Sequence, residues 1–185
     1  VLYDYRYHDF ERAWALLREF VENGGGLIVE TGVQRSPESN SSHLPPILPI
    51  NRTSWTKGSF EWDFSHENKL MVDDVDFAKF SPSVYDGNPW GFSISVNGSV
   101  SNWAETILWN HGDPVLVTGQ FGKGRVAWSG LNLPWHLQLY GNEEESKFLG
   151  NIVDWASMRL EEEKERISYE AFRVSPERVE IKVNN

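Results

Sequence analysis

The 185-residue sequence contains no cysteine. This absence excludes a thiolate nucleophile, a disulfide framework, cysteine-ligated zinc and an iron–sulfur cluster. It leaves the compartment open, because a cysteine-free chain suits oxidising and reducing surroundings alike. The sequence also lacks an apolar run near the roughly 20 residues of a membrane-spanning helix. No secretory signal peptide is visible.

Basic residues are scarce, with 17 Lys and Arg against 27 Asp and Glu, so the net charge is −10. This acidic balance argues against nucleic acid as a partner, because phosphate binding needs clustered Lys and Arg. The length fits one domain that can bury a sizeable core. The chain begins at Val1 rather than Met, and we interpret it as a piece of a longer protein, with any targeting segment outside it.

The first 33 residues predict a βαβ unit. A strand is expected over Val1–Tyr5, and Asp9 is a plausible N-cap for a helix whose apolar residues recur from Phe10 to Val21. Glycines in Asn23–Gly26 stop that helix, and Leu27–Glu30 reads as a buried strand. Strand, helix and strand in this order indicate a parallel sheet.

The middle of the chain, residues 34–111, predicts a loop and β insertion. Gln34–Pro49 is rich in Ser, Pro and Asn, and Thr53–Asn110 holds short aromatic runs broken by turn residues. Trp103–Trp109 is predicted as a short helical turn. Long insertions of this kind often carry function when they cap a scaffold.

The last third predicts a hairpin, a loop and a long helix. Strands are expected over Pro114–Thr118 and Gly124–Gly130, followed by a loop over Asn132–Asn142. Glu143–Glu165 has the apolar stripe of a helix, with three glutamates at its positive end. Residues 1–165 therefore form the predicted domain. Residues 166–185, with two alternating stretches, predict the start of a β-rich extension.

Two stretches carry a family resemblance: LLREFVENGGGLIVET over Leu16–Thr31 and PVLVTGQFGKGRVAWSGLNLPWH over Pro114–His136. They resemble the class I glutamine amidotransferase-like fold, and are similar to trehalose-utilisation (ThuA-like) proteins and to the trimerisation domain of certain β-galactosidases. They also resemble soluble domains of large prokaryotic membrane proteins, including some labelled 6-pyruvoyl-tetrahydropterin synthase-related. The resemblance covers residues 1–33 and 112–160. It implies an α/β, flavodoxin-like, mostly parallel sheet flanked by helices.

The sequence departs from this family at the catalytic turn. Amidotransferases place a Cys nucleophile after a central strand, with a downstream His and Glu. The corresponding turn here is Glu30-Thr31-Gly32, and no Cys exists anywhere. Glutaminase chemistry through a thioester is therefore excluded, and the resemblance implies a non-catalytic member without a cofactor.

His136, Glu30, Glu144 and Thr31 are the remaining catalytic candidates. The resemblance puts the family's His near His136, and one of Glu143–Glu145 could orient it. Glu30 ends its strand where open α/β sheets bind ligands, and if buried it needs a partner such as Arg125 or His136. Thr31 could act as a nucleophile only beside a base. The alternative is that His136 caps a loop, that the glutamates complement the helix dipole and that Thr31 is a turn hydroxyl.

Other motifs do not meet the requirements of a cofactor or metal site. Gly119–Arg125 lacks the spacing of a phosphate-binding loop and is followed by a strand, so it predicts a hairpin turn. Asp73, Asp74 and Asp76 do not have EF-hand spacing. The histidines show no zinc-binding pattern. We assign no metal and no cofactor.

Nine tryptophans are the main compositional anomaly, and six of them lie in or beside predicted loops. Aromatic rings stack on the apolar faces of sugars, so these loops are candidate ligand-binding elements. The alternatives are that the rings fill an irregular core or form a protein interface. The candidate ligand-binding residues are Trp135, Asn132, Trp90, Trp55 and Trp62.

Three N-x-S/T sequons begin at Asn40, Asn51 and Asn97 and favour an extracytoplasmic location. The leading hypothesis is a non-catalytic binding or assembly module of a larger, membrane-anchored protein, with a carbohydrate or a protein as partner and the possibility of a homo-oligomer. One alternative is a hydrolase or sugar-modifying enzyme that uses His136 with Glu30 or Glu144. The other is a structural oligomerisation domain.

Overall fold

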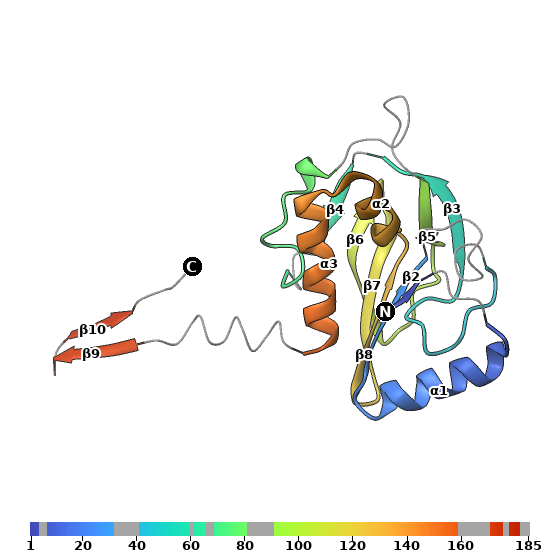
Figure 1. The fold of residues 1–185 in the computed structure, drawn as a ribbon, viewed down its shortest axis with the longest axis horizontal. Coiled ribbons are helices and arrows are strands. Elements are labelled where there is room, and N and C mark those ends of the chain that lie inside the picture. The colour runs from blue at the N-terminus through green and yellow to red at the C-terminus, as the bar shows by residue number, and fades with distance from the viewer. Residues whose placement is uncertain are drawn as a thin grey trace.

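The computed structural model describes residues 1–3, 7–31, 41–59, 61–65, 69–80, 91–158, 171–175 and 178–181. Within these ranges the chain is a mixed α/β protein built on a six-stranded sheet (Figure 1). No helix in the described part of the chain is long and apolar enough to cross a membrane.

The predicted βαβ unit is confirmed. Strand β1 spans Leu2–Tyr3, helix α1 spans Phe10–Glu22 and strand β2 spans Gly26–Glu30. The Asp9 carboxylate accepts a hydrogen bond from the Arg12 N–H at 3.0 Å, which satisfies one of the free donors at the helix start. β1 and β2 pair in parallel, as the connecting helix requires.

The central sheet has the order β1-β2-β8-β7-β6-β4. The pairs β1–β2 and β2–β8 are parallel, whereas β8–β7, β7–β6 and β6–β4 are antiparallel. The expected mostly parallel, flavodoxin-like sheet is therefore not what the described strands form. The reason is that tight hairpins join β6 to β7 and β7 to β8, and a hairpin reverses the chain. The later strands span Trp62–Phe64 (β4), Ala104–Asn110 (β6), Asp113–Phe121 (β7) and Gly124–Ser129 (β8).

Two predicted elements are wrong. Trp103–Trp109, expected as a helical turn, belongs largely to β6, which pairs with β7 on one side and β4 on the other. Asn132–Asn142, expected as a loop, contains helix α2 over Leu133–Tyr140. Proline in the first turn fits a helix start, and Gly141 ends α2 with a φ of +60°.

Helix α3 spans Glu143–Ala156 and ends before the predicted Glu165, because Ser157 and Met158 form a turn in which Met158 has a φ of +63°. Residues 159–165 lie outside the described residues. The two strands predicted after it are present as β9, Ala171–Ser175, and β10, Arg178–Ile181. They pair antiparallel in a separate two-stranded sheet.

The insertion contributes a second small sheet, as the short-strand prediction expected. Strands β3, Thr53–Lys57, and β5, Gly91–Ser95, pair antiparallel, and a 3-10 turn η1 covers Phe77–Lys79. Ser93 joins β5 to the end of the main sheet. Its N–H donates to the Gly130 carbonyl at 2.9 Å, and its Oγ donates to the Thr31 carbonyl at 2.7 Å.

Apolar residues pack on both faces of the main sheet. Side chains alternate along β2, so Leu27 and Val29 join one cluster while Ile28 joins the other. α1 contributes Trp14 and Val21 to the first cluster. α3 contributes Phe148, Ile152 and Trp155 to the second. The described core is thus a sheet between helices, and the small sheet lies at its end (Figure 1).

Candidate functional site

Glu30 occupies the position that the sequence predicted, the carboxyl end of β2, and its side chain is only 1% exposed. The Ser129 hydroxyl at the end of β8 donates to Glu30 Oε1 at 2.7 Å. The Asn132 N–H donates to Oε2 at 3.0 Å. The predicted partners Arg125 and His136 are not these donors, because Arg125 donates instead to the Trp155 carbonyl.

The charge state of Glu30 follows from its burial. Desolvation raises its pKa to about 8, against the opposing effect of the hydrogen bonds from Ser129 and the backbone of Asn132 and Leu133. The carboxyl group is therefore mostly protonated at neutral pH. It lies at the start of α2 and joins β2 to that helix and to β8.

Thr31 is buried and its hydroxyl donates to the Ser129 carbonyl at 3.3 Å. Its own carbonyl accepts the hydrogen bond from Ser93. These contacts are those of a hydroxyl at a strand end that bonds backbone groups. They match the structural alternative for Thr31 rather than a nucleophile beside a base.

His136 and Glu145 form a sealed pair between α2 and α3. His136 Nδ1 lies 2.6 Å from Glu145 Oε2, and both side chains are 0% exposed. Glu145 is one of the three glutamates that the sequence offered as a partner for His136, whereas Glu30 and Glu144, the partners named for the enzyme alternative, do not occupy this place. Glu144 accepts hydrogen bonds from the Asp76 N–H and the Lys147 ammonium, which lower its pKa. The open pocket around His136 that an enzyme would need is not found among the described residues.

The remaining α2 candidates are packed rather than open. Asn132 is 5% exposed, precedes α2 with a φ of +60°, and its Oδ1 has no hydrogen-bond donor among the described residues. Trp135 is half-buried, and its ring lies 6.4 Å from that of His136.

Trp55 and Trp62, which the sequence placed in or beside loops, lie in β3 and β4 and pack against the protein's own groups. The half-buried Trp62 ring has the rings of Phe77, Phe80 and Phe92 within 5.7–6.2 Å. The half-buried Trp55 ring covers Gly91, where a Cβ would lie 2.6 Å from the indole. Both positions therefore fit the packing alternative better than a sugar-stacking platform. Trp90 lies outside the described residues.

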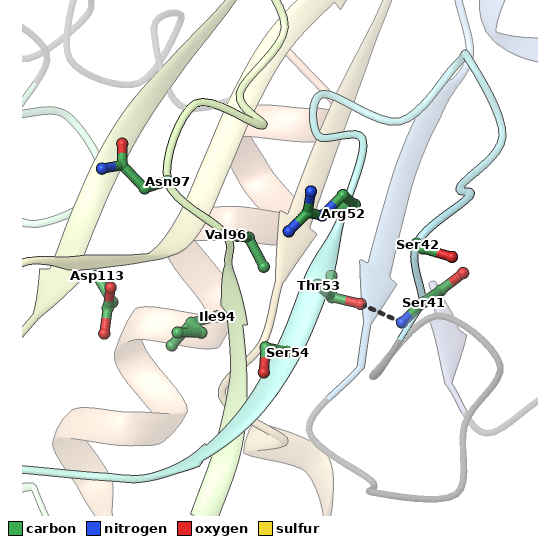
Figure 2. Close-up of a pocket in the computed structure, with 9 residues that line it drawn as sticks. All are labelled: Ser41, Ser42, Arg52, Thr53, Ser54, Ile94, Val96, Asn97 and Asp113. Carbon is green, nitrogen blue, oxygen red and sulfur yellow. Dashed lines mark hydrogen bonds between the residues drawn. The ribbon is translucent and has the colours of Figure 1, made fainter.

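A groove of about 580 Å³ lies on the small sheet, and we call it the β3–β5 groove (Figure 2). Arg52 and Ser54 present one face of the β3 segment, and Ile94 and Val96 present the same face of the β5 segment. Ser54 is paired with Ile94, and the Arg52 carbonyl accepts from the Val96 N–H at 3.1 Å. The described residues that line it are Ser41, Ser42, Arg52, Thr53, Ser54, Ile94, Val96, Asn97 and Asp113.

Several polar groups in the β3–β5 groove are available to a ligand. Within the part of the chain that the structure describes, no hydrogen bond or ion pair engages the side chains of Arg52, Ser54, Asn97 or Asp113. Thr53 differs, because its Oγ1 accepts from the Ser41 N–H at 3.0 Å and fastens the neighbouring loop to β3 (Figure 2). Thr53 and Ser41 thus fix the edge of the groove, while four of its polar side chains have no partner in the described part of the chain.

The groove could not be predicted from the sequence, because its lining comes from separate segments of the chain. One signal was present: all three sequons contribute lining residues, Ser41 and Ser42, Arg52 and Thr53, and Asn97. Their convergence depends on the pairing of β3 with β5. No cluster of three or more His, Asp or Glu suited to a metal ion occurs among the described residues.

No family model matches the sequence, and neither does any curated protein. Solved structures do match the fold. A cytoplasmic protein from Salmonella typhimurium has a TM-score of 0.58 and 17% identity, over 84% of this chain and 70% of that one. A second, from Salmonella typhimurium LT2, has a TM-score of 0.54 and 18% identity, over 78% of this chain and 60% of that one. At these identities the likeness concerns the fold alone.

Proposed function

We propose that this chain is a non-catalytic binding domain that holds a carbohydrate in the β3–β5 groove. The observation that carries the proposal is that the candidate catalytic side chains are buried or engaged, whereas polar side chains of the groove are accessible. Of the four candidate catalytic groups, Glu30, Thr31 and His136 are sealed, with at most 1% exposure. The fourth, Glu144, accepts hydrogen bonds from the Asp76 N–H and the Lys147 ammonium. The polar side chains that have no partner among the described residues instead line an open groove.

The sealed groups argue against the enzyme alternative. A general base must come within hydrogen-bond reach of its substrate, either directly or through one water. His136 is held by Glu145 inside the α2–α3 contact, and Glu30 is held by Ser129 and the Asn132 N–H. Each of these contacts links two elements of the fold, so a role in stability accounts for the buried residues without catalysis.

The groove chemistry supports a sugar. Ser54 and Asn97 can both donate and accept hydrogen bonds, Arg52 donates and Asp113 accepts. A polyol presents donors and acceptors in similar number, and its C–H surface can lie on Ile94 and Val96. A volume of about 580 Å³ falls in the range of about 300–1,000 Å³ typical of small-ligand sites.

A glycan array followed by calorimetry tests this proposal. Ser54→Trp should fill the floor of the groove and abolish binding of the saccharides that bind to the unaltered chain. Ser146→Trp, on the exposed surface of α3, is the matched control and should bind as the unaltered chain does. Absence of any bound saccharide, or equal loss in the two variants, would contradict the proposal.

We further propose that the fold derives from an amidotransferase-like ancestor and that the domain belongs to a larger, membrane-anchored protein. The parallel strands β1, β2 and β8, with α1 and α3 on opposite faces, support this relationship. The antiparallel half, with β6 and β7, is where this chain differs from the doubly wound arrangement.

An assembly role is supported by one observation on α1. Leu16 and Phe20 are 58% and 55% exposed and lie one helical turn apart. Such side chains suit a contact with another protein or a second copy. Sedimentation velocity that shows a monomer at high concentration, unchanged in Leu16→Ser, would contradict self-assembly through this face.

A further inference from the structure

The β3–β5 groove has two charged side chains of opposite sign, which lie on either side of its apolar residues. Arg52 directly precedes β3, and Asp113 begins β7. Ile94 and Val96 lie between them in Figure 2. No ion pair engages either charge among the described residues. The groove therefore has a positive end, an apolar middle and a negative end.

The positive end is chemically specific. A guanidinium group binds a carboxylate through two parallel N–H···O bonds, a geometry that a lysine cannot reproduce. Arg52 is exposed, and its side chain has no partner in the described chain. In a protein with a net charge of −10, an arginine that no described residue pairs with gives this end of the groove a positive charge opposite in sign to the protein as a whole.

The negative end limits the ligand to one anionic group. Asp113 would repel a second carboxylate, but its oxygens can accept hydrogen bonds from sugar hydroxyls. Asn97 lines the same groove and can donate or accept. A ligand with a carboxylate at one end and hydroxyls at the other thus complements both ends.

We propose that the carbohydrate is an acidic saccharide of the uronic-acid type, with its carboxylate on Arg52, its C–H face on Ile94 and Val96, and ring hydroxyls on Asp113. This inference rests on the proposed carbohydrate-binding function and names its ligand class. Among the described residues that line the groove, Arg52 is the single basic one, so a second anionic group finds no further cation there.

A matched pair of ligands tests the proposal. The methyl glycoside of galacturonic acid carries one carboxylate, and its carboxyl-reduced counterpart, methyl galactoside, differs from it only in CH₂OH against that carboxylate. Calorimetry can compare the two on the full chain. The acidic form should bind at least about tenfold more tightly, since hydrogen bonds to charged groups are the stronger ones. Arg52→Gln should remove that difference, and Arg52→Lys should restore only part of it.

Arg12→Gln is the control, because it removes the same charge from the exposed surface of α1. It should leave the preference for the acidic form unchanged. Equal affinity for acidic and reduced forms would overturn the acidic-ligand inference and leave carbohydrate binding intact. A preference that survives Arg52→Gln would also overturn it. Absence of binding by both forms and by every glycan on the array would overturn the proposed function as well.

Discussion

The buried carboxyl of Glu30 makes stability depend on pH. Its folded pKa of about 8 exceeds the ordinary 4.5, so the folded chain holds the proton more tightly than the unfolded chain. The stability that the protonated Glu30 carboxyl contributes to the folded state is therefore fully present below about pH 4.5 and is lost as pH rises through about 8. We expect the free energy of unfolding, from urea titrations, to fall across this range.

Glu30→Gln tests that expectation. The amide cannot ionise, and its NH₂ can face Ser129 Oγ while its oxygen accepts from the Asn132 N–H. The variant should lose most of the pH dependence and be more stable than the unaltered chain at pH 8, by a few kcal/mol, since each pKa unit is worth about 1.4 kcal/mol. Identical pH profiles for the two proteins would contradict the buried, protonated state.

The His136–Glu145 pair should be structural. Removing one partner from a buried pair leaves an uncompensated polar group, which typically costs about 3–5 kcal/mol. We expect His136→Ala and Glu145→Ala each to lower the free energy of unfolding by this order, with strong coupling in a double-mutant cycle. Glu144→Ala is the control and should cost less. If Glu144→Ala and Glu145→Ala lowered the free energy of unfolding by similar amounts, a structural role particular to the His136–Glu145 pair would be contradicted.

At the residue scale, the sequence predicted where the candidate residues lie in the fold better than it predicted their hydrogen-bond partners. It placed Glu30 at a strand end, but Ser129 is 99 residues away and comes close only when β2 pairs with β8. It placed a glutamate of Glu143–Glu145 near His136 without fixing which one. The phase of α3 decides this, because neighbouring residues point about 100° apart on a helix.

At the element scale, local sequence patterns predicted the helices and strands that have clear caps and turns. They failed for elements whose structure depends on contacts with distant segments. The βαβ unit and the β7–β8 hairpin carry strong caps and turns, and both were predicted. The segment of β6 looked like a helical turn, because its pairing with β4 and β7 is invisible in its own residues. α2 was missed for a similar reason, since Glu30 supplies a capping contact from a distant strand.

Gly130 controls how the small sheet joins the large one. A Cβ at this position would clash with the Ser93 carbonyl, whose strand β5 carries Ile94 of the groove. We expect Gly130→Ala to destabilise the protein by about 1–3 kcal/mol and to weaken saccharide binding. Gly150→Ala is the control, because its site on α3 is open, and it should stabilise by about 1 kcal/mol. Unimpaired stability and binding in Gly130→Ala would contradict this.

At the scale of the molecule, the sequence predicted an α/β domain with a β insertion and missed the mixed direction of its sheet. Strand direction depends on which strands become neighbours, and two hairpins place β7 and β6 beside β8 in antiparallel orientation. The groove was missed for the same reason, since it exists only after β3 and β5 pair. The insertion supplies eight of the nine described residues that line the groove, and Asp113 of β7 supplies the ninth.

The central claim is that ligand binds at the β3–β5 groove and that the sealed cluster has a structural role. Amide chemical-shift mapping by NMR, during titration with a saccharide identified on the array, tests it most directly. The account predicts shifts concentrated at Ser54, Ile94 and Val96. Shifts concentrated at Glu30 and His136, with the groove unperturbed, would contradict it. They would indicate that the ligand binds at the carboxyl edge of the sheet.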